Sequence, residues 1–148
     1  MRKRGVDTNV LIYAHLASFP EHAAVRRFLL RELSDRDVRC VVTPMVLHEF
    51  VHVVTDARRF HRPVAMPEAL AVARLYLEHE NVECASVDGD ALRDAFEWIE
   101  RYKLGRKRIA DTLLAATLIR CGAKEIITCN SDDFRVFDGL AALDPRDT

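Results

Sequence analysis

The sequence predicts an α/β fold: one domain with a central parallel sheet of four to five strands and helices on both faces. Short runs of β-branched and apolar residues alternate with longer segments of helical periodicity along the 148 residues. Several helical segments open with proline or an N-capping residue. Because crossovers between parallel strands usually carry helices, this alternation favours a parallel sheet that is covered on both faces.

The first half of the chain predicts two strands and two helices. Residues 6–16 pass from a brief extended start into an apolar run, and residues 20–36 have the apolar spacing of an amphipathic helix. Residues 38–43 form a β-branched run that ends in Thr-Pro, a good N-cap followed by proline at the first helical position. The helix that starts there is expected to run to about Arg59.

The second half repeats the alternation of helices and strands. The predicted elements are, in order, a helix at 66–80, a strand at 82–87, helices at 88–102 and 108–122, a buried strand at 125–129 and a short strand at 140–143. No repeat, low-complexity tract or flexible linker interrupts them, so residues 1–148 are expected to form one domain.

Composition excludes several classes of protein. The formal charge of −1 and the pI near 6.6 give no overall basic field for nucleic acid, so any RNA contact needs a local patch, for which 2–4 and 105–108 are the candidates. The four cysteines form no C-x-x-C pair, and no apolar run is long enough to cross a membrane. We therefore expect a reduced, cytoplasmic protein without a membrane segment.

Acidic residues from distant segments are predicted to meet at one edge of the sheet. Sites in such folds lie beyond the carboxyl ends of the strands. The residues at that edge are Asp7 after the first strand, Glu49 in the second turn of the next helix, Asp111 in the first turn of the helix at 108–122, and Asn130, Asp132 and Asp133 after the strand at 125–129. Two helices precede that last strand, so the 103–108 loop has to return Asp111 to the edge.

Each acid taken alone also fits a helix cap or a turn. Together, however, three or four close carboxylates repel one another strongly. A hard divalent cation relieves this repulsion, and an oxygen-only ligand set suits Mg²⁺ or Mn²⁺ better than zinc. Asp111 is flanked by apolar residues, where an unpaired charge is costly. The sequence therefore favours a magnesium or manganese site.

The segment His48-Glu49-Phe50-Val51-His52 matches the H-E-x-x-H zinc motif and raises an alternative, a zinc metallohydrolase. That function needs a third protein ligand, and the metzincin extension fails because Thr55 and Arg58 occupy its last two positions. The two histidines share a helix face, with Glu49 about 100° away. They can line the mouth of a cleft, contact a partner or be solvated.

Four blocks, "VDTNVLIYA", "VLHEFVHV", "IADTLLAATL" and "ITCNSDDF", resemble the PIN-domain family across residues 6–134, and within it the VapC-type toxins of toxin–antitoxin pairs. The resemblance implies a Rossmann-like sheet and a Mg²⁺- or Mn²⁺-dependent ribonuclease that leaves 5′-phosphate and 3′-hydroxyl ends. It also implies an antitoxin partner. The chain departs from the family where "RKRG" precedes Val6, which makes the first strand short or polar at its start.

The resemblance also assigns roles to residues. Asp7, Glu49, Asp111 and Asp133 match the family's acidic positions, which are both catalytic and metal-binding. The supporting positions are Thr8, Asn130 and, with no direct match, Asp132. Beside Asp111, a basic cluster is the best candidate for guiding RNA phosphates: Arg106, Lys107 and Arg108. Lys3 and Arg4 are weaker candidates.

Two further questions stay open in the sequence. A PIN domain that binds RNA or a partner without turnover is the second alternative, and intact acids at all four positions argue against it. The apolar faces of the helices at 20–35 and 44–58 fit a homodimer or an antitoxin groove, but core packing explains them equally well.

Overall fold

Five parallel strands form one sheet in the order β3-β2-β1-β4-β5 in the computed structural model, which describes residues 1–147. The strands are β1 (Arg2–Val6), β2 (Val38–Val42), β3 (Val82–Cys84), β4 (Glu125–Ile127) and β5 (Ala141–Leu143). The α-helices are α1 (Thr8–His15), α2 (His22–Ser34), α3 (Pro44–Val54), α4 (Met66–Glu78), α5 (Gly89–Arg101) and α6 (Ile109–Arg120). Two 3-10 turns, η1 (Arg106–Arg108) and η2 (Ser131–Asp133), complete the order.

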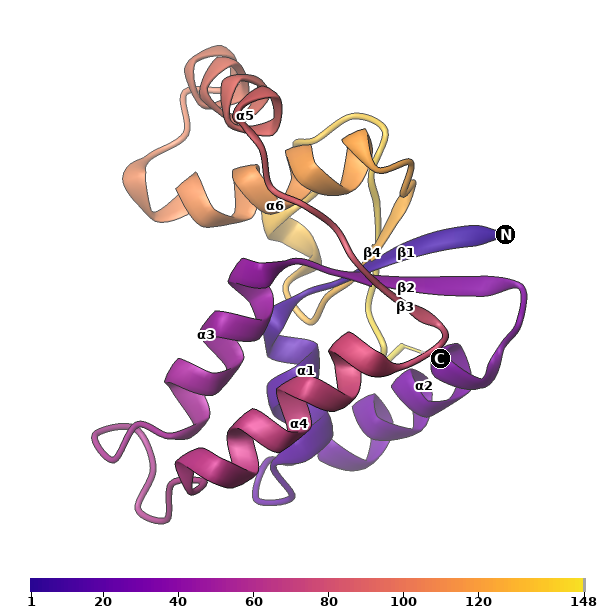
Figure 1. The fold of residues 1–148 in the computed structure, drawn as a ribbon. Helices are drawn as coiled ribbons and strands as arrows, with labels where there is room; N and C mark the ends of the chain where they lie inside the picture. Colours follow the sequence, from indigo (N-terminus) through magenta and orange to yellow (C-terminus); the bar gives the residue numbers. More distant parts are fainter. Residues whose placement is uncertain (148) are drawn as a thin grey trace.

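Helices cover both faces of the sheet, as predicted. Helices α1 to α4 lie on one side and α5 and α6 on the other (Figure 1). The chain builds the sheet outwards from β1 through β2 to β3, then crosses to the opposite side of β1 to form β4 and β5. The strand order therefore reverses between β1 and β4. In open α/β sheets, ligands bind beyond the carboxyl ends of the strands at such a switch point.

The basic N-terminal stretch is part of β1, which therefore begins earlier than the polar residues suggest. Arg4 pairs with Glu32 of α2 at 2.6 Å and with Glu125 of β4 at 3.1 Å. Lys3 pairs with Glu83 at 3.0 Å. Both cations are thus engaged within the fold, which weakens the expectation that they bind RNA.

Three other boundaries differ from the predicted ones. Helix α3 ends at Val54 rather than near Arg59, and the Asp56 side chain accepts the Arg58 N–H in the turn that follows. Strands β3 and β4 are also shorter than predicted, ending at Cys84 and Ile127. None of these changes moves an acidic residue away from the predicted edge.

A glycine in the middle of the sheet lets α6 lie close to β1. A Cβ atom on Gly5 would stand 2.3 Å from a methyl carbon of the buried Leu118, so any side chain there would push helix and strand apart. Close packing of α6 on β1 sets the position of Asp111, in the first turn of α6, relative to the carboxyl end of β1.

The helices and the cysteines of the described residues bear on two further predictions, the one about membrane segments and the one about thiols. Within residues 1–147, no helix is both long and apolar enough to cross a membrane. The four cysteines are free thiols, with Cys40 and Cys129 buried and Cys84 exposed.

Candidate active site

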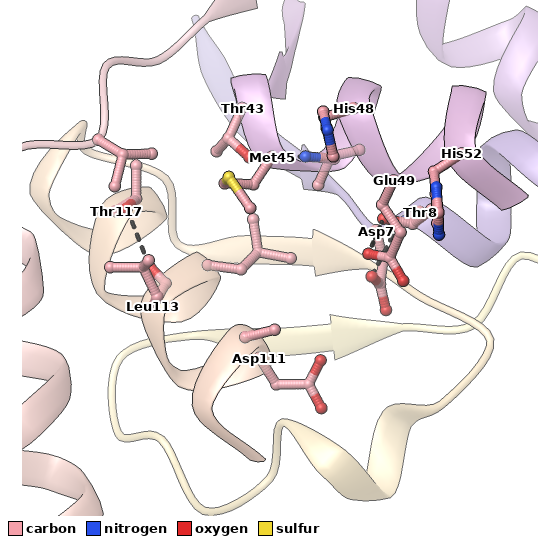
Figure 2. A pocket seen from close by; sticks show the side chains of 14 residues that line it. Asp7, Thr8, Thr43, Met45, His48, Glu49, His52, Asp111, Leu113 and Thr117 are labelled. Atoms are coloured by element: carbon pink, nitrogen blue, oxygen red, sulfur yellow. Dashed lines mark hydrogen bonds between the residues drawn. The ribbon is translucent and has the colours of Figure 1, made fainter. Parts of the chain in front are cut away.

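A cavity of about 280 Å³ opens between α3 and α6 at the carboxyl end of β1. Its acidic end contains Asp7, Thr8, Glu49 and Asp111. Its other end is lined by Met45 and Leu113 together with Thr43 and Thr117 (Figure 2). Three of the four predicted catalytic acids therefore face one space. Asp133 lines a neighbouring hollow, but its charge acts on both Asp7 and Asp111.

Asp7 is held rigidly at the centre of this site. It caps the N-terminus of α1, where Oδ1 accepts the Thr8 N–H at 2.8 Å. Its Oδ2 accepts the Thr128 hydroxyl at 2.8 Å and the Asn9 amide at 3.2 Å. Burial raises the pKa of Asp7, the Thr128 and Thr8 hydrogen bonds oppose the rise, and the charges of Glu49 and Asp133 add to it.

Glu49 reaches the same place from α3. The helix is positioned by its N-cap, since the Thr43 hydroxyl accepts the Val46 N–H at 3.2 Å. The Thr8 hydroxyl donates to Glu49 Oε2 at 3.0 Å. Thr8 thus joins the two acids, because its N–H binds Asp7 and its hydroxyl binds Glu49.

The fold also perturbs the ionisation of Asp111. Desolvation by burial, followed by the charges of Asp7 and Asp133, raises its pKa to about 6. Arg108 opposes the rise, with Nε at 3.7 Å from Asp111 Oδ2. The guanidinium of Arg108 also donates to the Asp133 backbone carbonyl, so this one cation connects the first turn of α6 with η2.

The remaining predicted residues divide into two groups. Arg108 lies against the acids, whereas Arg106 and Lys107 are exposed beside it. Asp132 is turned to solvent, with a side chain that is 83% exposed and paired with Arg135. Asn130 contributes its backbone N–H to the Thr128 hydroxyl at 3.0 Å, and its side chain is exposed.

Two residues of the site were missed in the sequence, Asn9 and Thr128. Thr128 is fully buried and links Asp7 to the turn after β4, while the side-chain Oδ1 of Asn9 accepts the Cys129 N–H at 3.1 Å. The available signals were the Asn two positions after Asp7 and the hydroxyl residue that directly follows β4. Both residue types are common in turns, so neither signal was specific.

The donor set fits a hard divalent cation. Burial is the main cause of the raised pKa values of Asp7 and Asp111, and the charges of the neighbouring carboxylates add to both rises. Within the described part of the chain, no three His, Cys, Asp or Glu side chains already stand in metal-holding geometry. A cation would therefore have to draw these carboxylates inward, and oxygen donors suit Mg²⁺ or Mn²⁺.

His48 and His52 also line the cavity, together with Glu49 (Figure 2). The cavity is wide enough to include both the histidine face of α3 and Glu49 on the adjoining face. Of the three roles open in the sequence for these histidines, the structure favours lining the cleft. The metallohydrolase alternative requires a third protein ligand for zinc. Within residues 1–147, no group of three His, Cys, Asp or Glu side chains stands in metal-holding geometry.

Comparisons with known proteins place the chain in a family. The PIN domain family matches residues 6–140. Ribonuclease VapC24 of Mycobacterium tuberculosis is 28% identical over 140 residues, which cover 95% of this chain and 94% of that protein. Ribonuclease VapC43 of the same organism is 42% identical over 64 residues, or 43% of each chain.

Solved structures share the fold. VapBC from Salmonella typhimurium, determined bound to DNA, superposes with a TM-score of 0.67 at 19% identity, covering 98% of this chain and 99% of that one. VapC20 of Mycobacterium tuberculosis, a toxin that cleaves the sarcin-ricin loop, gives a TM-score of 0.64 at 20% identity over 82% of this chain and 85% of that one. Because the family matches residues 6–140, which include every acid-bearing segment, the chain belongs to the PIN domain family.

Proposed function

We propose that this chain is a metal-dependent endoribonuclease and the toxin of a toxin–antitoxin pair. The observation that carries the proposal is the convergence of Asp7, Glu49, Asp111 and Asp133, from four separate segments, at the switch point of the sheet. The names of the relatives, which are ribonucleases, support the choice of RNA as the substrate.

Asp7 and Asp111 are proposed as the most direct ligands of Mg²⁺ or Mn²⁺, with Glu49 and Asp133 completing the site. The ion supplies charge neutralisation at the phosphate and acidifies a water for attack. Three uncharged donors bind the Asp7 carboxylate, and the hydrogen bonds from Thr128 and Thr8 oppose the rise in its pKa that burial causes. Thr8 fixes the distance between Asp7 and Glu49 through its two hydrogen bonds.

Arg108 is placed to meet the negatively charged substrate. Its guanidinium lies at the edge of the acid cluster, and exposed Arg106 and Lys107 extend the positive charge along η1. Lys and Arg contacts to phosphate position the strand without reading its sequence. Attack of water on phosphorus then breaks the P–O3′ bond and transfers a proton to O3′, which leaves 5′-phosphate and 3′-hydroxyl ends.

An antitoxin is proposed as the protein partner. Several structurally similar proteins were solved as toxin–antitoxin complexes, including one from Klebsiella pneumoniae with a TM-score of 0.65. On this chain, Phe96 is 54% exposed and Ile109 is 45% exposed, which leaves apolar surface on α5 and at the start of α6 for such a partner. A homodimer remains a prediction from the sequence.

The experiment that tests the function is cleavage of a fluorescent single-stranded RNA with Mg²⁺, with Mn²⁺ or with EDTA. Asp7→Asn and Asp111→Asn keep the shape of each side chain and remove its charge, so each is expected to lower the cleavage rate more than about 100-fold. Asp132→Asn is the matched control and is expected to cleave at the wild-type rate. Equal rates for wild type and both site variants would contradict the proposal.

A further inference from the structure

The histidine pair of α3 has a geometry of its own. His48 and His52 are exposed side chains one turn apart, and both face the cavity that contains the acids. Their rings are stacked nearly parallel, at an interplanar angle of 9°, with 6.4 Å between the ring centroids. Figure 2 shows the two rings side by side along the helix, next to Glu49 and Thr8.

This geometry is unsuited to holding one metal ion. An imidazole nitrogen offers its lone pair in the plane of its ring, and zinc binds at about 2.0–2.1 Å from that nitrogen. An ion shared by both rings would therefore have to lie in both ring planes. Stacked rings that are parallel within 9° and 6.4 Å apart have no such common point. The zinc motif of the sequence is thus not a zinc site in this arrangement.

The same geometry suits a flat aromatic ring. Stacked aromatic rings have their centroids about 4.5–7 Å apart. The ring centroids of His48 and His52 are 6.4 Å apart, and rotations of these two exposed side chains can open space for a base between the rings. Every nucleobase has a π-face, so stacking of this kind is available to single-stranded RNA of any sequence.

The position of the pair relative to the acids supports the same ligand. Glu49 directly follows His48 in α3, and its carboxylate binds the Thr8 hydroxyl beside Asp7. A phosphate at the acids thus brings the base of an adjoining nucleotide to the histidines. Met45, one turn before His48 and 56% exposed, continues the row of stacking surfaces along the cavity.

We propose that His48 and His52 form a nucleobase-binding subsite, which clamps one unpaired base of a single-stranded RNA next to the phosphodiester at the acids. The inference rests on the proposed ribonuclease function and adds a requirement to it. The base at this position has to leave its stack before it can enter the gap. Unpaired loops and single strands are therefore the substrates, and a continuous duplex is not.

The test measures binding rather than cleavage. Asp7→Asn protein, which is expected not to cut, is titrated into a single-stranded RNA hexamer that contains 2-aminopurine, a base whose fluorescence falls when it stacks. His48→Ala and His52→Ala, each added to Asp7→Asn, are expected to weaken binding about five-fold or more and to lose the quenching. His48→Phe and His52→Phe keep a flat ring and are expected to bind within about two-fold of the parent.

His61→Ala is the matched control, because His61 is an exposed histidine in the loop after α3 and is expected to bind like the parent. Thermal melting of each variant checks that α3 is intact. Unchanged binding and quenching in the alanine variants would overturn the subsite, and so would phenylalanine variants as weak as the alanine ones. The proposed function is judged separately, by metal-dependent cleavage in the wild type, so either can fail while the other stands.

Discussion

A cation within β1 and an acid directly after β1 have different kinds of hydrogen-bonding partners. Arg4, within the strand, is largely buried and binds two carboxylates, Glu32 and Glu125. Asp7, directly after the strand, is 8% exposed and receives its hydrogen bonds from Thr8, Asn9 and Thr128, all uncharged. Its charged neighbours on the other elements are further acids.

The contrast separates charges that hold the fold together from charges kept for a ligand. A buried ion pair with good geometry is self-sufficient, because each partner compensates the desolvation of the other. A group of acids without sufficient positive charge is unstable on its own and is completed by a bound cation. The acids beyond the carboxyl end of β1 are therefore expected to lower the stability of the metal-free protein, and the ion pairs of Arg4 are expected to raise it.

The largest expected change in stability comes from breaking the ion pairs of Arg4. Arg4→Met leaves Glu32 and Glu125 without their shared cation in a largely buried place. Loss of one partner of a buried pair costs about 3–5 kcal/mol, so we expect the free energy of unfolding in urea to fall by about 3 kcal/mol or more.

Arg93→Met is the matched control for that measurement. Arg93 pairs with Asp90 at 2.6 Å, but its side chain is 77% exposed. Exposed pairs contribute little, so the change is expected to be below about 1 kcal/mol. If Arg4→Met lowered the free energy of unfolding no more than Arg93→Met, the conclusion that the ion pairs of Arg4 stabilise the fold would be wrong.

The second largest change in stability is expected from removing the charge of Asp111. The pKa of Asp111 rises to about 6 in the folded chain from an ordinary value of 3.8, so between these pH values the folded state holds a proton that the unfolded state has released. Stability from this group is therefore lost as the pH rises through that window. We expect Asp111→Asn to stabilise the metal-free protein by roughly 2 kcal/mol at pH 7.

The pH dependence distinguishes this effect from general packing. Urea unfolding in EDTA is compared for wild type and Asp111→Asn at pH 7 and at pH 4. The advantage of Asp111→Asn is expected to shrink towards zero at pH 4, where wild-type Asp111 is protonated in the folded state. An advantage that is equal at both pH values, or a destabilised variant at pH 7, would contradict the electrostatic explanation.

The smallest effect is expected from the hydroxyl that supports Asp7. Thr128→Val keeps the shape of the buried side chain and removes the hydrogen bond to Asp7 Oδ2, together with the acceptor for the Asn130 N–H. We expect the free energy of unfolding to fall by about 1 kcal/mol. Thr117→Val, which removes a hydroxyl bond to a carbonyl within α6, serves as the control and should cost less.

Much of this arrangement followed from the sequence. Asp7, Glu49 and Asp111 could be placed at one edge because parallel strands end together and helices begin where strands end. The uncertain step was Asp111, since two helices precede β4. The structure resolves it through Gly5 and Leu118, whose close contact seats α6 directly on β1.

The rest depended on contacts between distant segments, which periodicity does not encode. Thr128 becomes a partner of Asp7 only once β4 pairs with β1. The early end of α3 coincides with a turn in which the Asp56 side chain accepts the Arg58 N–H, and an Asp is equally compatible with a helix surface. For His48 and His52, the shared face was predictable from their spacing, but the parallel stacking of the rings was not.

The pairing of β4 with β1 also sets an order of events during synthesis. Asp7 and Glu49 leave the ribosome early, but Thr128 and Asp133 belong to the segment that follows β4. In a nascent chain that has not reached this segment, β1 lacks its neighbour β4, and Asp7 lacks the hydrogen bond from the buried Thr128 hydroxyl. A growing chain therefore has no assembled acid cluster until β4 is in place beside β1.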